Sequence, residues 1–241
     1  MHYILFSVFI TFLILIFPIV SGAIAYIFEL KELEGRLLQT LAFVIAGIIG
    51  CIIGKIKFGN LKNIGLKKSE ISNYKDYLWF FPLIFIEVLP LFFGIKKTLN
   101  TPIIITYIIF TMAVGFSEEL YFRGIIAKTL KRKSILFAIL ISSFLFSIGH
   151  ASNLLAGANL IDTILQIVFA FIFGVVAVEI SFSTDSLVIP ILWHTLHNFI
   201  SLITIRNEGK WSFIVGIIQG FILAIYGIFL WKICTQQVKN K

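Results

Sequence analysis

Two glutamates and an arginine stand inside an otherwise apolar run, in the sequence G-F-S-E-E-L-Y-F-R-G at residues 115–124. Glu119 and Arg123 are four residues apart, so on a helix they share a face and can form a charge-assisted ion pair. Glu118 is turned about 100° away by the helical step and can face a cavity. An ion pair that only joins helices would leave Glu118 as a second buried carboxylate without a partner. Because ionisable groups inside a membrane are costly, the pattern predicts a site around Glu118.

Two further apolar runs carry polar side chains at helical spacing. Phe146 and His150 are four residues apart, and so are His194 and Asn198. Each pair therefore lies on one helix face. A single histidine in a membrane helix commonly forms an interhelical hydrogen bond. Two such helices in a chain that also has a Glu-Glu helix instead favour one shared site.

These groups can meet only if they lie at the same height in the membrane. Counted from Arg132, Glu118 is 14 residues away along one arm of a helical hairpin and His150 is 18 along the other. The offset of four residues corresponds to about 6 Å, which a helix tilt can absorb. His194 is only 7 residues past Leu187, so it reaches this height only if the hairpin extends beyond the start of its helix.

The elements that must position these residues are membrane helices. The chain has 241 residues, of which 59% are hydrophobic and 13% charged, and its mean hydropathy is +1.01. A soluble domain would expose more polar surface. A helix needs about 20 apolar residues to cross the hydrocarbon core, and eight runs meet or nearly meet this length: Tyr3–Phe28, Leu37–Gly54, Tyr77–Ile95, Pro102–Ile126, Ile135–Ser152, Thr163–Ile180, Leu187–Ile205 and Ser212–Ile233. We therefore predict an all-α polytopic membrane bundle of about eight transmembrane helices, forming one domain over residues 1–241 with its motif core at residues 102–205.

The distribution of Lys and Arg predicts the orientation of the chain. Thirteen of these residues fall on the side of the predicted spans that holds both termini, and six fall on the other side. The positive-inside rule therefore predicts cytoplasmic N- and C-termini. Because the net charge of +8 is dispersed over loops, we expect membrane lipid as a partner and no nucleic acid. The high content of Ile, Lys, Phe and Asn suggests a prokaryotic cytoplasmic membrane.

The three motifs together resemble those of the CAAX prenyl endopeptidase and bacteriocin-processing family of intramembrane proteases, also called the Abi family. Its pattern appears here in order, as E-E-L-Y-F-R at 118–123, F-S-I-G-H at 146–150 and H-T-L-H-N at 194–198. Each motif is weak alone, but their order on successive helices is specific. The resemblance covers residues 118–198. It implies an endopeptidase that cleaves a membrane-associated or lipidated peptide or protein, and we expect its active site to open toward the cytoplasm.

The resemblance also implies a role for each residue. Glu118 would be the general base that activates a water, assisted by His150. His194 and Asn198 would donate hydrogen bonds to the developing oxyanion of the scissile carbonyl. The supporting residues would be Glu119, Arg123 and Phe146.

This scheme requires no cofactor, but the sequence also permits a catalytic zinc. Glu118, His150 and His194 could supply three ligands and leave an open position for water. The chain has no His-Glu-x-x-His helix. Asn198 and the paired carboxylates suit oxyanion and base roles, so metal-free activation of water is favoured.

Two other classes of function stay open. Glu118, His150 and His194 could relay protons or bind an ion in a coupled transporter. Against this, the chain has no inverted repeat, and its polar groups are concentrated in one patch. In the other class, a non-catalytic bacteriocin-immunity membrane protein could keep the fold and only sequester a peptide.

Three polar residues fall outside the assigned roles. His197 is three residues from His194 and is assigned to packing or to support of the site. Glu87, in the middle of the third run, is expected to pair with polar groups of the site or to line a cavity. Glu179 is expected near a helix end, within reach of water.

Overall fold

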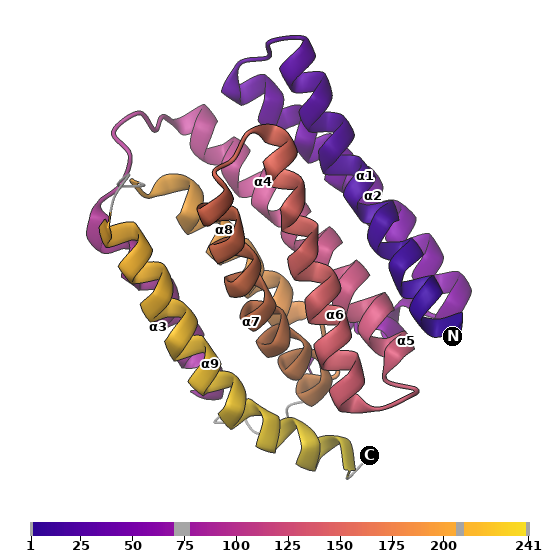
Figure 1. Ribbon diagram of the computed structural model, residues 1–241. Coiled ribbons are helices and arrows are strands. Elements are labelled where there is room, and N and C mark those ends of the chain that lie inside the picture. The colour runs from indigo at the N-terminus through magenta and orange to yellow at the C-terminus, as the bar shows by residue number, and fades with distance from the viewer. Residues whose placement is uncertain (1, 70–77, 206–209, 240–241) are drawn as a thin grey trace.

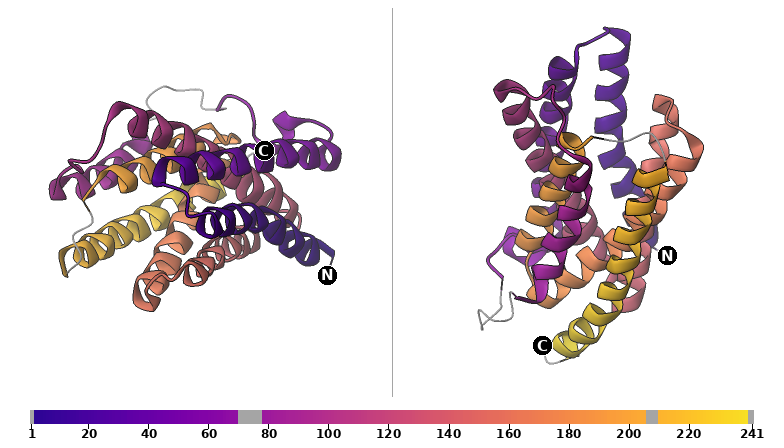
Figure 2. Two further views of the ribbon diagram at one scale, coloured as in Figure 1. Left: turned by 90° about the horizontal axis from the view of Figure 1, so that it is seen from above. Right: turned by 90° about the vertical axis from the view of Figure 1, so that its left-hand side faces the viewer.

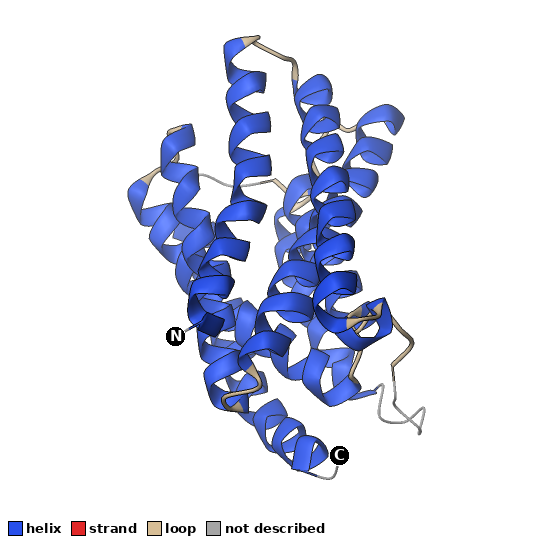
Figure 3. Ribbon diagram, turned by 90° about the vertical axis from the view of Figure 1, so that its right-hand side faces the viewer, coloured by secondary structure: helices blue, strands red, loops and turns tan. Residues whose placement is uncertain are grey.

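The computed structural model describes residues 2–69, 78–205 and 210–239, and every regular element within these ranges is a helix (Figure 3). The predicted all-α fold class is therefore confirmed. The elements in chain order are α1 (His2–Ile27), α2 (Glu32–Phe58), η1 (Leu61–Ile64), α3 (Phe81–Val88), η3 (Leu89–Phe93), α4 (Thr101–Glu119), η4 (Leu120–Ala127), α5 (Lys128–Leu130), α6 (Ile135–Gly149), η5 (His150–Ala156), α7 (Leu160–Thr184), α8 (Val188–Ile203) and α9 (Lys210–Lys239).

Helices long and apolar enough to cross a membrane account for six of the eight predicted spans. In the described part of the chain they are His2–Ile27, Glu32–Phe58, Thr101–Leu130, Ile135–Leu155, Leu160–Thr184 and Ile214–Thr235. The third and seventh predicted spans are shorter apolar helices, Leu78–Phe93 and Val188–Ile203. Large apolar side chains cover the outside of the bundle, for example Phe92 at 82% exposure and Leu155 at 81%. Such a surface requires lipid as its solvent, so the protein is an integral membrane protein.

The two short helices are joined at one end of the bundle. η3 ends at Gly94, whose φ of +90° turns the chain in a way that favours glycine. The Ile205 amide donates to the Gly94 carbonyl at 3.0 Å, and the Lys96 amide donates to the Ile203 carbonyl at 2.8 Å. The ends of the third and seventh predicted spans therefore pair with each other as antiparallel backbone instead of continuing as helices.

The helices pack in two rows (Figure 2). α1, α2, α4 and α8 are successive neighbours, and α6, α7 and α9 form the second series. Two close approaches between helices occur at glycines: a Cβ on Gly115 would lie 2.6 Å from Thr195 Oγ1, and one on Gly174 would lie 2.9 Å from Ser143 Cβ. Small residues let membrane helices approach closely. Gly115 thereby brings α8 against α4 just before the two glutamates.

The end of α4 differs from the regular helix that the apolar pattern predicts. Leu120–Ala127 form a π-helix, η4, with Arg123 in its middle and all eight residues buried. Short π-helical segments are uncommon and occur frequently at functional sites. Ser142 of α6 donates its hydroxyl to the Phe122 carbonyl at 2.7 Å. The Phe122 carbonyl of the π-helix therefore has a hydrogen-bond donor from another helix, α6.

An ion-paired turn between α7 and α8 sets the height of α8. The carboxylate of Asp185 contacts Lys67 Nζ at 2.5 Å and Lys128 Nζ at 3.0 Å. Burial opposes ionisation of this carboxyl, but hydrogen bonds and positive charge from the two lysines outweigh it and lower the pKa of Asp185 below its ordinary value. The next backbone contact is the Leu187 amide, which donates to the Gly65 carbonyl at 2.8 Å. α8 therefore begins against the 61–68 segment.

Candidate active site

A cavity of about 310 Å³ lies between α1, α2, α4, α6, α7 and α8. It is lined by all four predicted catalytic residues, Glu118, His150, His194 and Asn198. The condition on height is met because α8 begins beside Gly124, where a Cβ would lie 3.1 Å from Leu187 Cδ1. Glu118 is six residues from Gly124, and His194 is seven from Leu187. The hairpin turn at residues 131–134 extends beyond this contact. His194 can therefore lie at the same height in the membrane as Glu118.

His194 stands between the two glutamates. Its Nδ1 lies 2.7 Å from Glu119 Oε1, and its Nε2 lies 3.6 Å from Glu118 Oε2. The Glu119 side chain is completely buried, whereas the Glu118 side chain is 17% exposed and reaches the cavity. The predicted division of the pair is therefore confirmed, with Glu118 at the cavity and Glu119 inside the protein. The contact between His194 and both carboxylates was not predicted.

Arg123 is buried against Glu119 and an aromatic ring. Its Nη1 lies 3.0 Å from Glu119 Oε1, so the predicted ion pair is present. Its guanidinium carbon lies 4.3 Å from the centre of the Phe146 ring, a cation–π contact. Phe146 also meets His150 and His194 edge to face, at centroid distances of 5.4 and 5.8 Å. One aromatic side chain thus contacts the cation and both histidines.

His150 has a partner that the sequence did not predict. Its Nδ1 lies 3.5 Å from Gln166 Nε2, and Gln166 Oε1 accepts a hydrogen bond from Asn153 Nδ2 at 2.8 Å. All three residues line the cavity. In the sequence, this contact could have been suspected only from the presence of a glutamine, Gln166, in an apolar run. The orientation of the His150 ring is therefore supported by α7 and η5 together.

The arrangement does not assemble the alternative metal site. Among residues 2–69, 78–205 and 210–239, no group of three His, Cys, Asp or Glu side chains could hold a metal ion. Both nitrogens of His194 already face carboxylates, and His150 is directed at Gln166. The set Glu118, His150 and His194 is not brought together as ligands here.

A second buried polar cluster lies behind the cavity. Glu87, 1% exposed, accepts a hydrogen bond from Trp193 Nε1 at 2.9 Å, and its two oxygens lie 3.1 and 2.9 Å from His197 Nδ1. Phe173 stacks on Trp193 at 3.9 Å and contacts the rings of His194 and His197 at 5.1 and 5.5 Å. Glu87 thus pairs with α8 rather than lining the cavity, and His197 joins α8 to α3.

Removal of the Glu87 carboxylate should destabilise the protein. Glu87→Ala removes the acceptor of the buried Trp193 indole N–H and the contact with His197 Nδ1, so we expect a loss of roughly 1–3 kcal/mol in the free energy of unfolding. Thermal unfolding in detergent would measure the loss, and Glu87→Gln, which keeps an acceptor oxygen, should lose less. Equal stability of Glu87→Ala and the wild type would contradict a structural role for this cluster.

Glu179 corrects an expectation from the sequence. The predicted span ends at Ile180, which would put Glu179 near a helix end and within reach of water. α7 instead continues to Thr184, and Glu179 is only 2% exposed, facing α9 near Gly227. Its Oε2 has no hydrogen-bond partner among the described residues. The extra helical turn is the reason that the prediction was wrong.

The cavity lies toward the end of the bundle that is away from both chain termini. Its lining includes Pro18 in the second half of α1, Arg36 near the start of α2, and Ser201 near the end of α8. In Figure 1 both termini lie at the opposite end. Cytoplasmic termini and an opening toward the cytoplasm were both expected, whereas the cavity lies toward the end of the bundle that is away from the termini.

The fold and the cavity define a polytopic membrane protein with a buried centre of two carboxylates, two histidines and an arginine. Residues 100–200 match the family model of the type II CAAX prenyl endopeptidase Rce1-like proteins. The match spans α4 to α8 and contains all three motifs. It confirms the family resemblance predicted from those motifs and implies a protease. No curated protein matches the chain.

Proposed function

We propose that this protein is an intramembrane endopeptidase that hydrolyses a peptide bond in a membrane-associated or lipidated peptide or protein. The observation that carries the proposal is the placing of Glu118. It is the carboxylate that reaches the cavity, while its neighbour Glu119 is held by Arg123 and His194. A base with access to water next to fixed hydrogen-bond donors is what peptide hydrolysis requires.

In the proposed reaction Glu118 takes a proton from a water as the water oxygen attacks the scissile carbonyl carbon. His150, on the same cavity, assists by orienting that water. The tetrahedral intermediate then collapses, the C–N bond breaks, and Glu118 returns the proton to the leaving amine. One water is consumed, and a carboxyl and an amine are produced.

The proposed oxyanion donors are His194 and Asn198. An imidazolium has two N–H donors, so a protonated His194 would donate through Nδ1 to Glu119 and keep its Nε2 proton at the cavity. Asn198 adds an amide N–H from one turn further along α8. Loss of one such donor commonly lowers kcat by about 10²–10³-fold.

The function is tested by the peptides that cells release. Mass spectrometry should compare membrane and secreted peptides from cells that express wild-type protein or Glu118→Ala at equal levels. We expect at least one product to disappear in the variant while its precursor accumulates. If no peptide differs, and Glu118→Gln abolishes an ion flux in proteoliposomes, the protein is a transporter. If the variant still protects cells from a bacteriocin, a sequestering immunity role is supported.

Metal dependence is tested separately by chelation of the purified protein. We expect cleavage to persist after exhaustive treatment with a chelator, because the proposed steps use only side chains and water. Elemental analysis of the treated protein should accompany the activity assay. Loss of activity that zinc restores would overturn the metal-free mechanism and leave the assignment as a protease intact.

A further inference from the structure

The residues that line the cavity include Pro18, Arg36 and Ser201, which lie toward one end of the bundle. Both chain termini lie at the other end (Figure 1). α1 runs from the N-terminus toward the cavity end, and the α1–α2, α3–α4 and α6–α7 connections all lie at the cavity end. Polar side chains near these connections line the cavity, among them Arg36, Gln39, Asn153 and Gln166. The cavity therefore lies nearer the face of the bundle that carries these three connections.

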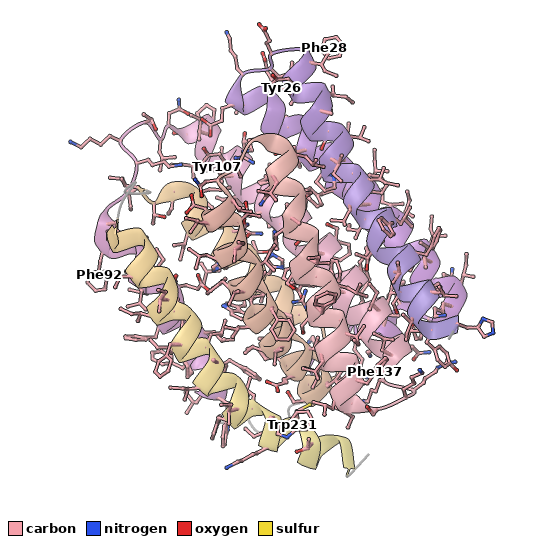
Figure 4. All side chains as sticks on the ribbon, in the orientation of Figure 1. Tyr26, Phe28, Phe92, Tyr107, Phe137 and Trp231 are labelled. Carbon is pink, nitrogen blue, oxygen red and sulfur yellow. The ribbon has the colours of Figure 1, made fainter. Side chains whose placement is uncertain are left out.

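Aromatic side chains mark both ends of the bundle (Figure 4). Tyr26 and Phe28, 86% and 70% exposed, lie at the cavity end, and Phe137 and Trp231 lie toward the termini. Aromatic residues are enriched at the two membrane–water interfaces. The two ends therefore correspond to the two faces of the membrane.

Positive charge is strongly unequal between the two ends. Within the described ranges, the end with the termini has eleven Lys and Arg: Lys55, Lys57, Lys62, Lys67, Lys68, Lys128, Lys131, Arg132, Lys133, Lys232 and Lys239. The cavity end has five: Lys31, Arg36, Lys96, Lys97 and Lys210. Four carboxylates accompany these five cations: Glu29, Glu32, Glu34 and Asp162. Loops rich in Lys and Arg stay in the cytoplasm.

We infer that the cavity opens on the extracytoplasmic face of the membrane. Resting on the proposed function, this assigns the substrate class: a peptide bond at or beyond the outer membrane interface, in an exported peptide or the outer end of a membrane segment. A lipid-modified C-terminus in the cytosol cannot reach this opening. This inference replaces the expectation of a cytoplasmic opening, because the cavity lies at the end of the bundle that has fewer Lys and Arg residues.

The inference is tested by thiol labelling of intact bacterial cells with a membrane-impermeant maleimide. The native cysteines are first replaced as Cys51→Ala and Cys234→Ala. Ala158→Cys then reports the cavity end, and Lys62→Cys reports the end with the termini; both positions are exposed. We expect Ala158→Cys to be labelled in intact cells and Lys62→Cys to be labelled only after permeabilisation.

A second pair of exposed positions repeats the measurement: Thr98→Cys at the cavity end and Arg132→Cys at the end with the termini. This pair replaces the first if either of the first variants does not insert into the membrane. Labelling of the Lys62→Cys end in intact cells, with or without labelling of the cavity end, would overturn the inference. Failure to label the cavity end in intact cells would overturn it too. Labelling does not depend on cleavage, so a reversed orientation together with Glu118-dependent cleavage would remove only this inference and leave the proposed protease.

Discussion

Glu118→Gln is expected to reduce peptide cleavage by roughly 10²–10⁴-fold, the contribution typical of a general base. The amide has nearly the same shape as the carboxylate but cannot accept the proton of the attacking water. Glu118 reaches the cavity, and its nearest ionisable partner, His194 Nε2, is 3.6 Å away, beyond hydrogen-bond distance. The substitution should therefore leave the fold in place. Cleavage of a verified substrate by the purified variant would measure the effect.

The matched control is Glu179→Gln. Glu179 is also a buried carboxylate in a membrane helix, but it faces α9 and does not line the cavity. We expect this variant to cleave at the wild-type rate. Thermal unfolding of both variants in detergent separates loss of chemistry from loss of folding. A folded Glu118→Gln protein that retains the wild-type rate would rule out Glu118 as the base.

Arg123→Met is expected to destabilise the protein by roughly 3–5 kcal/mol, the loss typical when one member of a buried ion pair is removed. Methionine keeps much of the length and apolar contact of arginine but has no charge. Glu119 would then remain completely buried, with only the His194 ring as a close polar side-chain partner. Equilibrium unfolding in detergent, monitored by tryptophan fluorescence, would measure the change in free energy.

The control for this variant is the double substitution Arg123→Met with Glu119→Gln. It removes both charges, and its glutamine can still accept the hydrogen bond from His194 Nδ1. We expect the double variant to be more stable than Arg123→Met alone, because no buried carboxylate is left unbalanced. If the double variant is the less stable of the two, the ion pair is not what stabilises Arg123 in the bundle.

Some features could be predicted because they depend only on local geometry. Glu119 and Arg123 are four residues apart, and a helix brings such residues together whatever surrounds it. The six long spans follow from apolar runs because backbone polar groups in lipid must be satisfied within a helix. The distribution of Lys and Arg likewise depends on sequence alone. These features place the carboxylate pair inside a membrane bundle before any coordinates are considered.

Other features depend on the rotation of each helix about its axis and on its position along the membrane normal. The spacing of His194 and Asn198 shows that they share a face, but it does not show that His194 contacts both glutamates. That contact needs the close approach of α4 and α8 at Gly115. The pairing of Glu87 with His197 and of Gln166 with His150 joins helices that are distant in sequence. Periodicity shows which side chains share a face of a helix. It does not show which other helix that face packs against.

The sequence by itself determined a membrane helix bundle, the ion pair of Glu119 with Arg123, and the residue types that could hydrolyse a peptide bond. Only the tertiary structure decided that Glu118, His150, His194 and Asn198 line one cavity and that this cavity lies at the end opposite the chain termini. The reason is physical. Hydrophobic length and helical spacing act within one helix, whereas a cavity exists only where several helices are held apart by the side chains between them.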